Sequence, residues 1–210
     1  MYTLYYSPGA ASMAVHLALL ELGAPHELRA VDLEAGQQKS AEYLKLNPAG
    51  VVPTLVVDDQ PRSECAALLL LLAERHPQAQ LAPVPGDSQR ALYLQWMLHL
   101  ANTAQPAFRQ WFYPFEFGDA EQETQVKELA RKRIEAVWDR LDAHLAAHGP
   151  HVLGEKLSIA DLYVTMLMRW SRNLPKPATQ WPALARLAGI VKARPSWARL
   201  YAAEGLSEWA

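Results

Sequence analysis

A hydroxyl-bearing segment near the start of the chain could bind an anion. Tyr6 ends a strand-like run, Pro8 and Gly9 make a turn, and Ser12 stands where small residues open a helical run. The first N–H groups of a helix have no partner within it and carry the positive end of its dipole, so a thiolate or carboxylate can bind there. Ser12 would add a hydroxyl donor. The alternative is an ordinary strand-to-helix turn that Ser12 caps.

Two further segments could hold a peptide-like ligand. Val52 precedes Pro53 just before a strand-like run, and a cis bond there would leave the Val52 N–H and C=O free to pair as an added strand does. Most X-Pro bonds are trans, so the residues alone favour a trans bond. Glu64 and Cys65 follow at the start of a helix, where a carboxylate could accept hydrogen bonds from an amine. Glu64 could equally do no more than complement the helix dipole.

The elements around these segments predict two domains. Hydrophobic spacing in the first part predicts the order βαβαββα, and everything after Pro85 has helical spacing. We therefore expect a thioredoxin-like α/β domain over residues 1–78, a proline-rich linker over 79–87 and an all-helical domain over 88–210. The expected strands and helices of the first part are 2–6, 11–22, 26–31, 41–46, 54–57, 62–63 and 64–75. The expected helices of the second part are 88–104, 121–148, 158–172, 182–192 and 197–204.

Composition excludes several classes of protein. The 210 residues carry a formal charge of -2, with 50% apolar and 20% charged residues, as in an ordinary globular protein. Nucleic acid is therefore not an expected partner. A single cysteine, Cys65, suits a reducing compartment, and residues 1–8 lack a secretory signal pattern. The longest apolar run is far short of the roughly 20 residues that span a membrane. We expect a cytoplasmic protein with no metal and no membrane partner.

The order and spacing of these motifs resemble one family. The segments 5–12 and 47–55 and the pair Glu64-Cys65 look like the glutathione site of bacterial glutathione transferases, most nearly the beta class. Ser158 to Asp161 resembles the helix-capping box of that family's second domain, in which the two residues satisfy each other's backbone donors. The resemblance covers essentially the whole chain.

The resemblance implies a set of contacts to glutathione. Val52 would pair its backbone with the cysteinyl part, and Pro53 would be cis. Glu64 and Cys65 would hold the γ-glutamyl end. Contacts to the glycyl carboxylate would come from Gln38 and Lys39, for which a solvated loop is the alternative.

The chain departs from the beta-class pattern at three positions. Ala11 stands where that class carries its active-site cysteine, which makes thiol-exchange chemistry unlikely to be its reaction. Gln105 stands where a histidine usually reaches the sulfur of the cofactor, and Cys65 replaces a serine or threonine, so a weak S–H donor replaces a hydroxyl. Ser12 is therefore the first candidate for stabilising the thiolate, with Tyr6 and Ser7 in reserve.

The acceptor substrate is expected between the domains. An aromatic run in the second domain offers an apolar wall for it, although core packing or a dimer contact is the alternative. The expected substrate-binding residues are Pro8, Phe108, Trp111, Phe112, Tyr113 and Arg169.

The resemblance implies an enzyme that conjugates the glutathione thiolate to small hydrophobic electrophiles, as a homodimer. A glutathione-dependent isomerase or dehalogenase on the same scaffold is one alternative. A binding or regulatory protein with weakened catalysis is another, because of Ala11 and Gln105.

Overall fold

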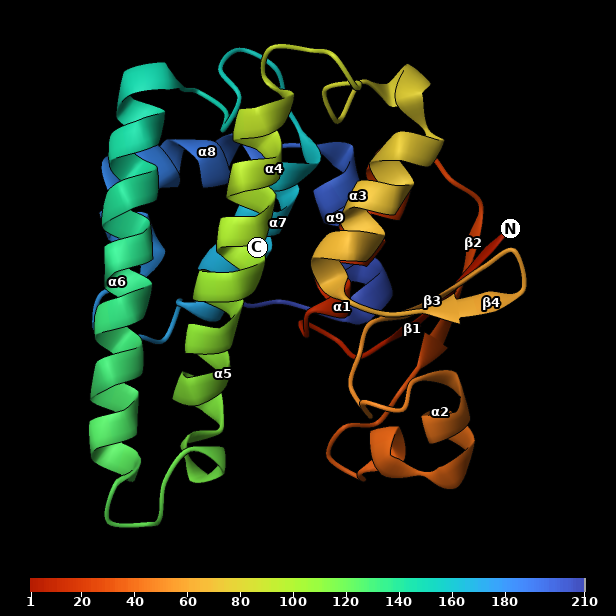
Figure 1. Ribbon diagram of the computed structural model, residues 1–210, viewed down its shortest axis with the longest axis vertical. Helices are drawn as coiled ribbons and strands as arrows, with labels where there is room; N and C mark the ends of the chain where they lie inside the picture. Colours follow the sequence, from red (N-terminus) through yellow and green to blue (C-terminus); the bar gives the residue numbers. More distant parts are fainter. Residues whose placement is uncertain (210) are drawn as a thin grey trace. The chain divides into compact units, whose positions relative to one another are not determined.

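The computed structural model describes residues 1–209, which form two compact units (Figure 1). The first unit comprises Met1–Val84 together with the segment from Lys192 onward, and the second comprises Pro85–Val191. The first is α/β and the second is all helical, which confirms the predicted fold class.

The first unit is built on a mixed four-stranded sheet with the strand order β2-β1-β3-β4. Its strands are β1 (Tyr2–Tyr6), β2 (His26–Ala30), β3 (Thr54–Val57) and β4 (Gln60–Arg62). β1 runs parallel to β2 and antiparallel to β3, with Tyr5 opposite Thr54. The end of β1 therefore meets the start of β3 at one edge. The fourth strand begins two residues earlier than predicted, because Asp58 and Asp59 make a tight turn with positive φ.

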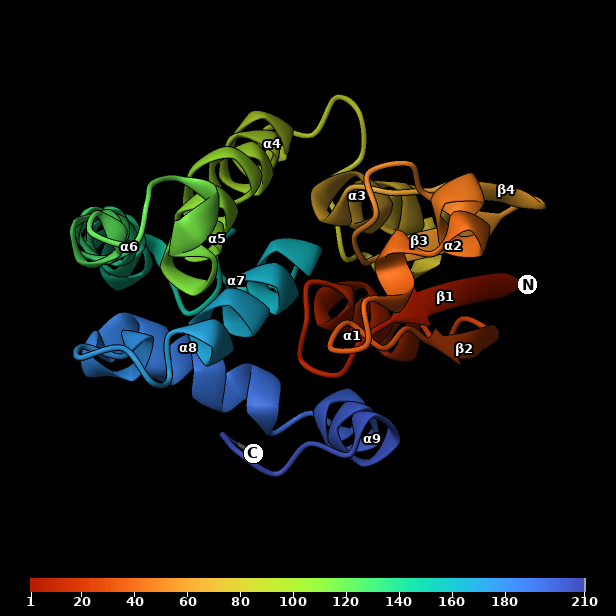
Figure 2. The same ribbon diagram turned by 90° about the horizontal axis from the view of Figure 1, so that it is seen from below.

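Helices α1 (Ser12–Glu21), α2 (Ala41–Leu46) and α3 (Cys65–Arg75) complete the predicted βαβαββα order. α1 is buried at every position from Ser12 to Leu19, and a helix buried all round needs cover on all its sides. It contacts β1, α3 and a further helix, α9 (Pro195–Glu204), which lies beside it in Figure 2.

The position of α9 differs from the expected domain division. The sequence places residues 197–204 with the helical domain, because their spacing is helical and they follow other helices. The structure assigns them to the first unit, where Arg194 and Ser196 both bind the Glu21 carboxylate at the end of α1. Helical periodicity identified the element but carries no information about which core its apolar face joins.

The second unit contains α4 (Arg90–His99), α5 (Gln105–Phe112), α6 (Glu123–His148), α7 (Ile159–Trp170) and α8 (Pro182–Lys192). The expected helix over 88–104 does not stop there. A π-helical segment, Leu100–Ala104, joins α4 to α5, and Pro106 lies in the first turn of α5. Proline has no N–H to donate to the helical ladder, and here it lies just after the π segment, where the pattern of helical hydrogen bonds shifts.

The predicted capping box forms at the start of α7. The Ser158 N–H donates to Asp161 Oδ2 over 2.6 Å, and the Val152 N–H donates to Asp161 Oδ1 over 2.7 Å. Asp161 is fully buried, so these bonds hold both the helix start and the preceding loop.

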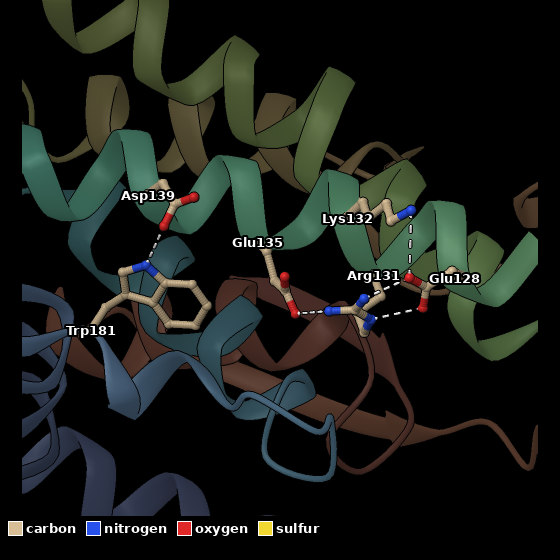
Figure 3. A network of polar contacts seen from close by, with 6 residues as sticks. All are labelled: Glu128, Arg131, Lys132, Glu135, Asp139 and Trp181. Atoms are coloured by element: carbon tan, nitrogen blue, oxygen red, sulfur yellow. Dashed lines mark hydrogen bonds and ion pairs between the residues drawn. The ribbon is translucent and has the colours of Figure 1, made fainter.

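α6 carries its charges as a network along the helix. Arg131 bridges Glu128 and Glu135, and Lys132 lies 3.6 Å from Glu128 (Figure 3). One turn further on, Asp139 accepts a 2.7 Å hydrogen bond from the indole N–H of Trp181. The spacing of three and four residues is the one that places side chains side by side on a helix.

Over residues 1–209, no helix is both long and apolar enough to cross a membrane.

Candidate functional site

Three backbone segments of the first unit meet at the edge where β1 ends. The sheet register brings the loop after Tyr6 next to the segment that precedes Thr54. The start of α3 joins them, because Cys65 Sγ donates a 3.4 Å hydrogen bond to the carbonyl of Ala11 at the start of α1. The three segments singled out in the sequence are thus brought together.

The segment before β3 contains a cis peptide bond between Val52 and Pro53, as the resemblance implied. The Val52 side chain is buried in a small cluster with Val31 and Tyr43. The backbone N–H and C=O of Val52, in contrast, have no hydrogen-bond partner among residues 1–209. They are a donor and an acceptor of the kind that pairs with an extended peptide.

The loop after β1 is held by its own hydroxyl. Ser12 Oγ accepts from the Ser7 N–H over 3.1 Å and donates to the Ser7 carbonyl over 3.2 Å. The Ser12 side chain is fully buried. Its only hydrogen is therefore directed at the Ser7 carbonyl, and Ser12 does not cap α1, whose N-cap residue is Ala11. Tyr6 and Ser7 are partly exposed and Pro8 is exposed.

A carboxylate from α9 also binds this loop. Glu204 accepts a 2.9 Å hydrogen bond from the Gly9 N–H, and its other oxygen lies 2.8 Å from Nδ1 of His16 on α1. Glu204 and His16 are buried. No local pattern marked this pair, because the two side chains are 188 residues apart in sequence.

The start of α3 offers unpaired N–H groups next to an unusual backbone conformation. Glu64 precedes the helix with φ 71° and ψ 105°. A non-glycine residue costs free energy in this region, and such residues cluster at functional sites. The Glu64 side chain is exposed and has no partner within the described part of the chain.

Cys65 has a buried thiol that bonds within the protein. Its side chain is buried against Ala11, and burial, with a smaller contribution from the charge of Glu64, raises the pKa of the thiol. The S–H is thus directed at the Ala11 carbonyl, and the expected contact from this thiol to glutathione stays a prediction. Its backbone N–H is a further candidate donor.

Gln38 and Lys39 lie just before α2. Lys39 Nζ is exposed and donates to the Ala49 carbonyl over 3.3 Å, next to the Gly50 turn. Gln38 is partly buried, and its Oε1 atom has no partner among the described residues. The Lys39 side chain thus lies against the loop that leads to Val52, whereas Gln38 Nε2 donates to the Leu33 carbonyl over 3.4 Å.

In the second unit, Gln105 is fixed by Tyr163, whose hydroxyl donates to its side-chain carbonyl. Phe108 follows the core alternative, since it is fully buried and its ring packs against those of Trp138 and Trp170. Arg169 is also buried, at 5% exposure.

The remaining aromatic residues of this run are accessible. Trp111 is partly exposed, whereas Phe112 and Tyr113 are 45% and 41% exposed. Arg109 stacks over the Tyr113 ring at 5.2 Å and also pairs with Glu116. Trp111, Phe112 and Tyr113 therefore expose apolar surface that a hydrophobic ligand could contact.

No group of three or more His, Cys, Asp or Glu side chains is arranged to hold a metal ion within residues 1–209. His144 and His148 stand one turn apart on α6, with ring centroids 5.0 Å apart. His144 Nε2 bonds to the Val152 carbonyl, which places that ring in the packing of the loop.

Two family models match the chain. The glutathione S-transferase N-terminal domain matches residues 10–75, and the glutathione S-transferase C-terminal domain matches residues 124–203. A glutathione S-transferase of Xanthomonas campestris pv. campestris is 34% identical, over 81% of this chain and 82% of the relative. The chain belongs to the glutathione S-transferase family.

Solved structures agree with this assignment to the transferase family. A glutathione transferase homologue from Sulfitobacter, crystallised with bound glutathione, has a TM-score of 0.90 at 28% identity and covers 99% of both chains. The beta-class transferase of Sphingomonas chungbukensis has a TM-score of 0.85 at 31% identity, over 98% of this chain and all of the other. The resemblance stated from the motifs is confirmed, including the likeness to the beta class.

Proposed function

We propose that this transferase binds glutathione in its first unit and transfers the glutathione thiolate to a small hydrophobic electrophile. The observation that carries the proposal is the Val52 peptide. Its N–H and C=O have no partner among residues 1–209, and it lies beside the start of α3, whose first N–H groups also have no partner among those residues. Glutathione is a short peptide with a free amine and two carboxylates. An extended backbone pair and a helix N-terminus suit it.

The proposed contacts follow the geometry of the first unit. Val52 would pair with the cysteinyl part, and Glu64 with the α3 N–H groups would hold the γ-glutamyl end. Lys39 and Gln38 would reach the glycyl carboxylate. Glu64 supports this role because its carboxylate is exposed and its backbone is held in a costly conformation.

Ser7 is the proposed hydroxyl donor to the sulfur. Its side chain is partly exposed, and its Oγ has no hydrogen bond with any residue from 1 to 209, whereas Ser12 Oγ is committed to Ser7. A free thiol has a pKa of about 8.5, so lowering it by two units corresponds to roughly 2.7 kcal/mol of preference for the thiolate. A hydroxyl donor and the start of α1 could supply that amount. Tyr6 remains the reserve.

The electrophile is proposed to contact the exposed rings of Phe112, Tyr113 and Trp111. We place the reaction in the cytoplasm, where a reduced lone cysteine is stable. The family resemblance supports a homodimer, which sedimentation velocity would test directly.

The proposal is tested by ultraviolet titration of the bound thiol in the wild type and in two serine variants. Ser7→Ala should raise the pKa of bound glutathione by about one unit, because it loses a donor to the sulfur. Ser12→Ala is the matched control and should mainly lower stability. An unchanged pKa in Ser7→Ala would refute the role of Ser7.

Immobilised glutathione and an activated aryl halide separate the enzyme from its alternatives. Retention together with conjugation supports the transferase. Retention without turnover supports a binding or regulatory protein, and no retention contradicts the proposal.

A further inference from the structure

The carbonyl of Val51, one residue before the proposed glutathione contact, is held by two side chains from α2 and its end. Tyr43 Oη donates to it over 2.9 Å, and Asn47 Nδ2 donates over 2.8 Å. A carbonyl oxygen has two lone pairs, so this acceptor is fully used. The orientation of the Val51-Val52 peptide is thereby fixed.

The same tyrosine also binds the residue after the cis bond. Tyr43 Oη lies 2.8 Å from Thr54 Oγ1, and since its one hydrogen points to Val51, the Thr54 hydroxyl donates in this contact. Tyr43, Asn47 and Thr54 are 5%, 3% and 0% exposed. Burial raises the pKa of the Tyr43 phenol, which keeps it a donor at neutral pH.

α2 itself is placed by local contacts. Ser40 Oγ caps it by accepting from the Tyr43 N–H, and Asn47 Oδ1 accepts from the Ala49 N–H. Tyr43 lies within α2 and Asn47 directly follows its last residue, Leu46, and both side chains reach the same carbonyl. The Tyr43 ring packs in the cluster that buries the Val52 side chain. The Val52 side chain is therefore packed and the Val51 carbonyl is hydrogen-bonded, whereas the N–H and C=O of Val52 have no partner in the part of the chain that the structure describes.

We propose that Tyr43 and Asn47 are positioning residues that orient the Val52 peptide for pairing with glutathione. The inference rests on the proposed function. A loop already held in its binding conformation loses less freedom when the ligand binds, so affinity gains from the two anchors. Neither side chain is proposed to touch the sulfur. The anchors should therefore affect glutathione affinity and leave turnover at saturating glutathione nearly unchanged.

Tyr43→Phe tests this, because it removes the hydroxyl and keeps the ring. Tyr2→Phe is the matched control: it removes a tyrosine hydroxyl bonded to His76 Nε2 over 3.0 Å, at the opposite end of β1. Calorimetry with glutathione should show a Kd raised about five- to tenfold in Tyr43→Phe and changed by less than about twofold in Tyr2→Phe. In both variants kcat should stay within about twofold of the wild type.

Asn47→Asp provides a second variant that keeps the acceptor for Ala49 and removes the donor to Val51. It should raise the Kd for glutathione in the same way. If Tyr43→Phe does not fold, the Kd of Asn47→Asp alone tests whether the Val51 anchor orients the Val52 peptide. If the wild type binds glutathione and the Kd is the same in Tyr43→Phe, Asn47→Asp and Tyr2→Phe, the positioning role is overturned. The proposed function is then unaffected. No binding by the wild type overturns the proposed function and this inference together.

Discussion

At the scale of single residues, surroundings decide what a reactive group can do. Cys65 lies at the start of a helix, a position that commonly lowers a thiol pKa. Here the side chain is buried and donates to the Ala11 carbonyl, and burial, with a smaller contribution from the charge of Glu64, raises the pKa of the thiol. The thiol is a packing and hydrogen-bonding group in this fold.

We therefore expect Cys65 to resist alkylation in the folded protein. Iodoacetamide at about pH 8 should leave it unmodified, because a thiol whose pKa is raised stays protonated there and is not nucleophilic. Mass spectrometry after addition of guanidinium should show complete modification of the same residue. Rapid labelling without denaturant would contradict the buried, protonated thiol.

Turns and helix starts leave local signals in sequence, and residue types therefore predicted three segments that meet in the structure: the turn at Pro8, the Val52-Pro53 pair and the start of α3 at Glu64. Their part in binding glutathione stays a prediction. The direction of a side chain leaves no such local signal. Ser12 turns inward to Ser7, and Phe108 joins a core of rings from other helices. The packing of Phe108 depends on Trp138, which is distant along the chain, whereas Ser12 bonds to Ser7, only five residues away, and residue type does not show in which direction its hydroxyl turns.

At the scale of elements, α9 is tied to the end of α1. Glu21 accepts from the guanidinium of Arg194 over 2.9 Å and from Ser196 Oγ over 2.5 Å. Burial alone would raise the pKa of Glu21, but the bonds from Arg194 and Ser196 outweigh it, and the pKa is lowered from 4.5. A lowered pKa means that the folded state prefers the carboxylate.

Glu21→Gln should cost about 1 kcal/mol of unfolding free energy at pH 7, a modest value because Arg194 is partly open to solvent. The stabilisation is present above the unfolded pKa of Glu, and it is lost as the pH falls through the lower, folded pKa. Urea titrations of both proteins should therefore converge near about pH 3. A difference that persists unchanged in acid would show that the charge of Glu21 is not responsible.

Periodicity predicted the existence of most elements and misjudged one junction. The helix expected over 88–104 ends at Ala104, whereas the chain passes through a π segment and continues through Pro106 to Phe112. A proline permits both outcomes, and the packing of α5 against α6 selects between them. Sequence patterns alone do not contain that contact.

At the scale of the whole molecule, the first unit is made from two separate stretches of chain. Glu204 on α9 binds the Gly9 N–H and His16, and so connects the second stretch to the loop proposed to face the glutathione sulfur. A buried carboxylate of this kind is costly to alter, because its partners would remain buried without it.

Glu204→Gln should lower the free energy of unfolding by about 2 to 4 kcal/mol, because an amide cannot serve as acceptor to both Gly9 and His16 in the same way. Glu27→Gln is the control, since Glu27 forms only an exposed pair with Arg29 and should change stability by less than about 0.5 kcal/mol. Chemical denaturation measures both. Similar small losses in the two variants would contradict a structural role for Glu204.

Because the first unit is made from two separate stretches of chain, its parts leave the ribosome at different times. The helical unit, Pro85–Val191, is one continuous stretch and can fold once it has left the ribosome. The first stretch of the α/β unit is synthesised earlier, but α9 leaves the ribosome last. Until then, Gly9 and His16 lack their hydrogen-bond partner Glu204. The proposed glutathione site is therefore synthesised first and completed last, and we expect the nascent chain to gain glutathione affinity only after Glu204 has left the ribosome.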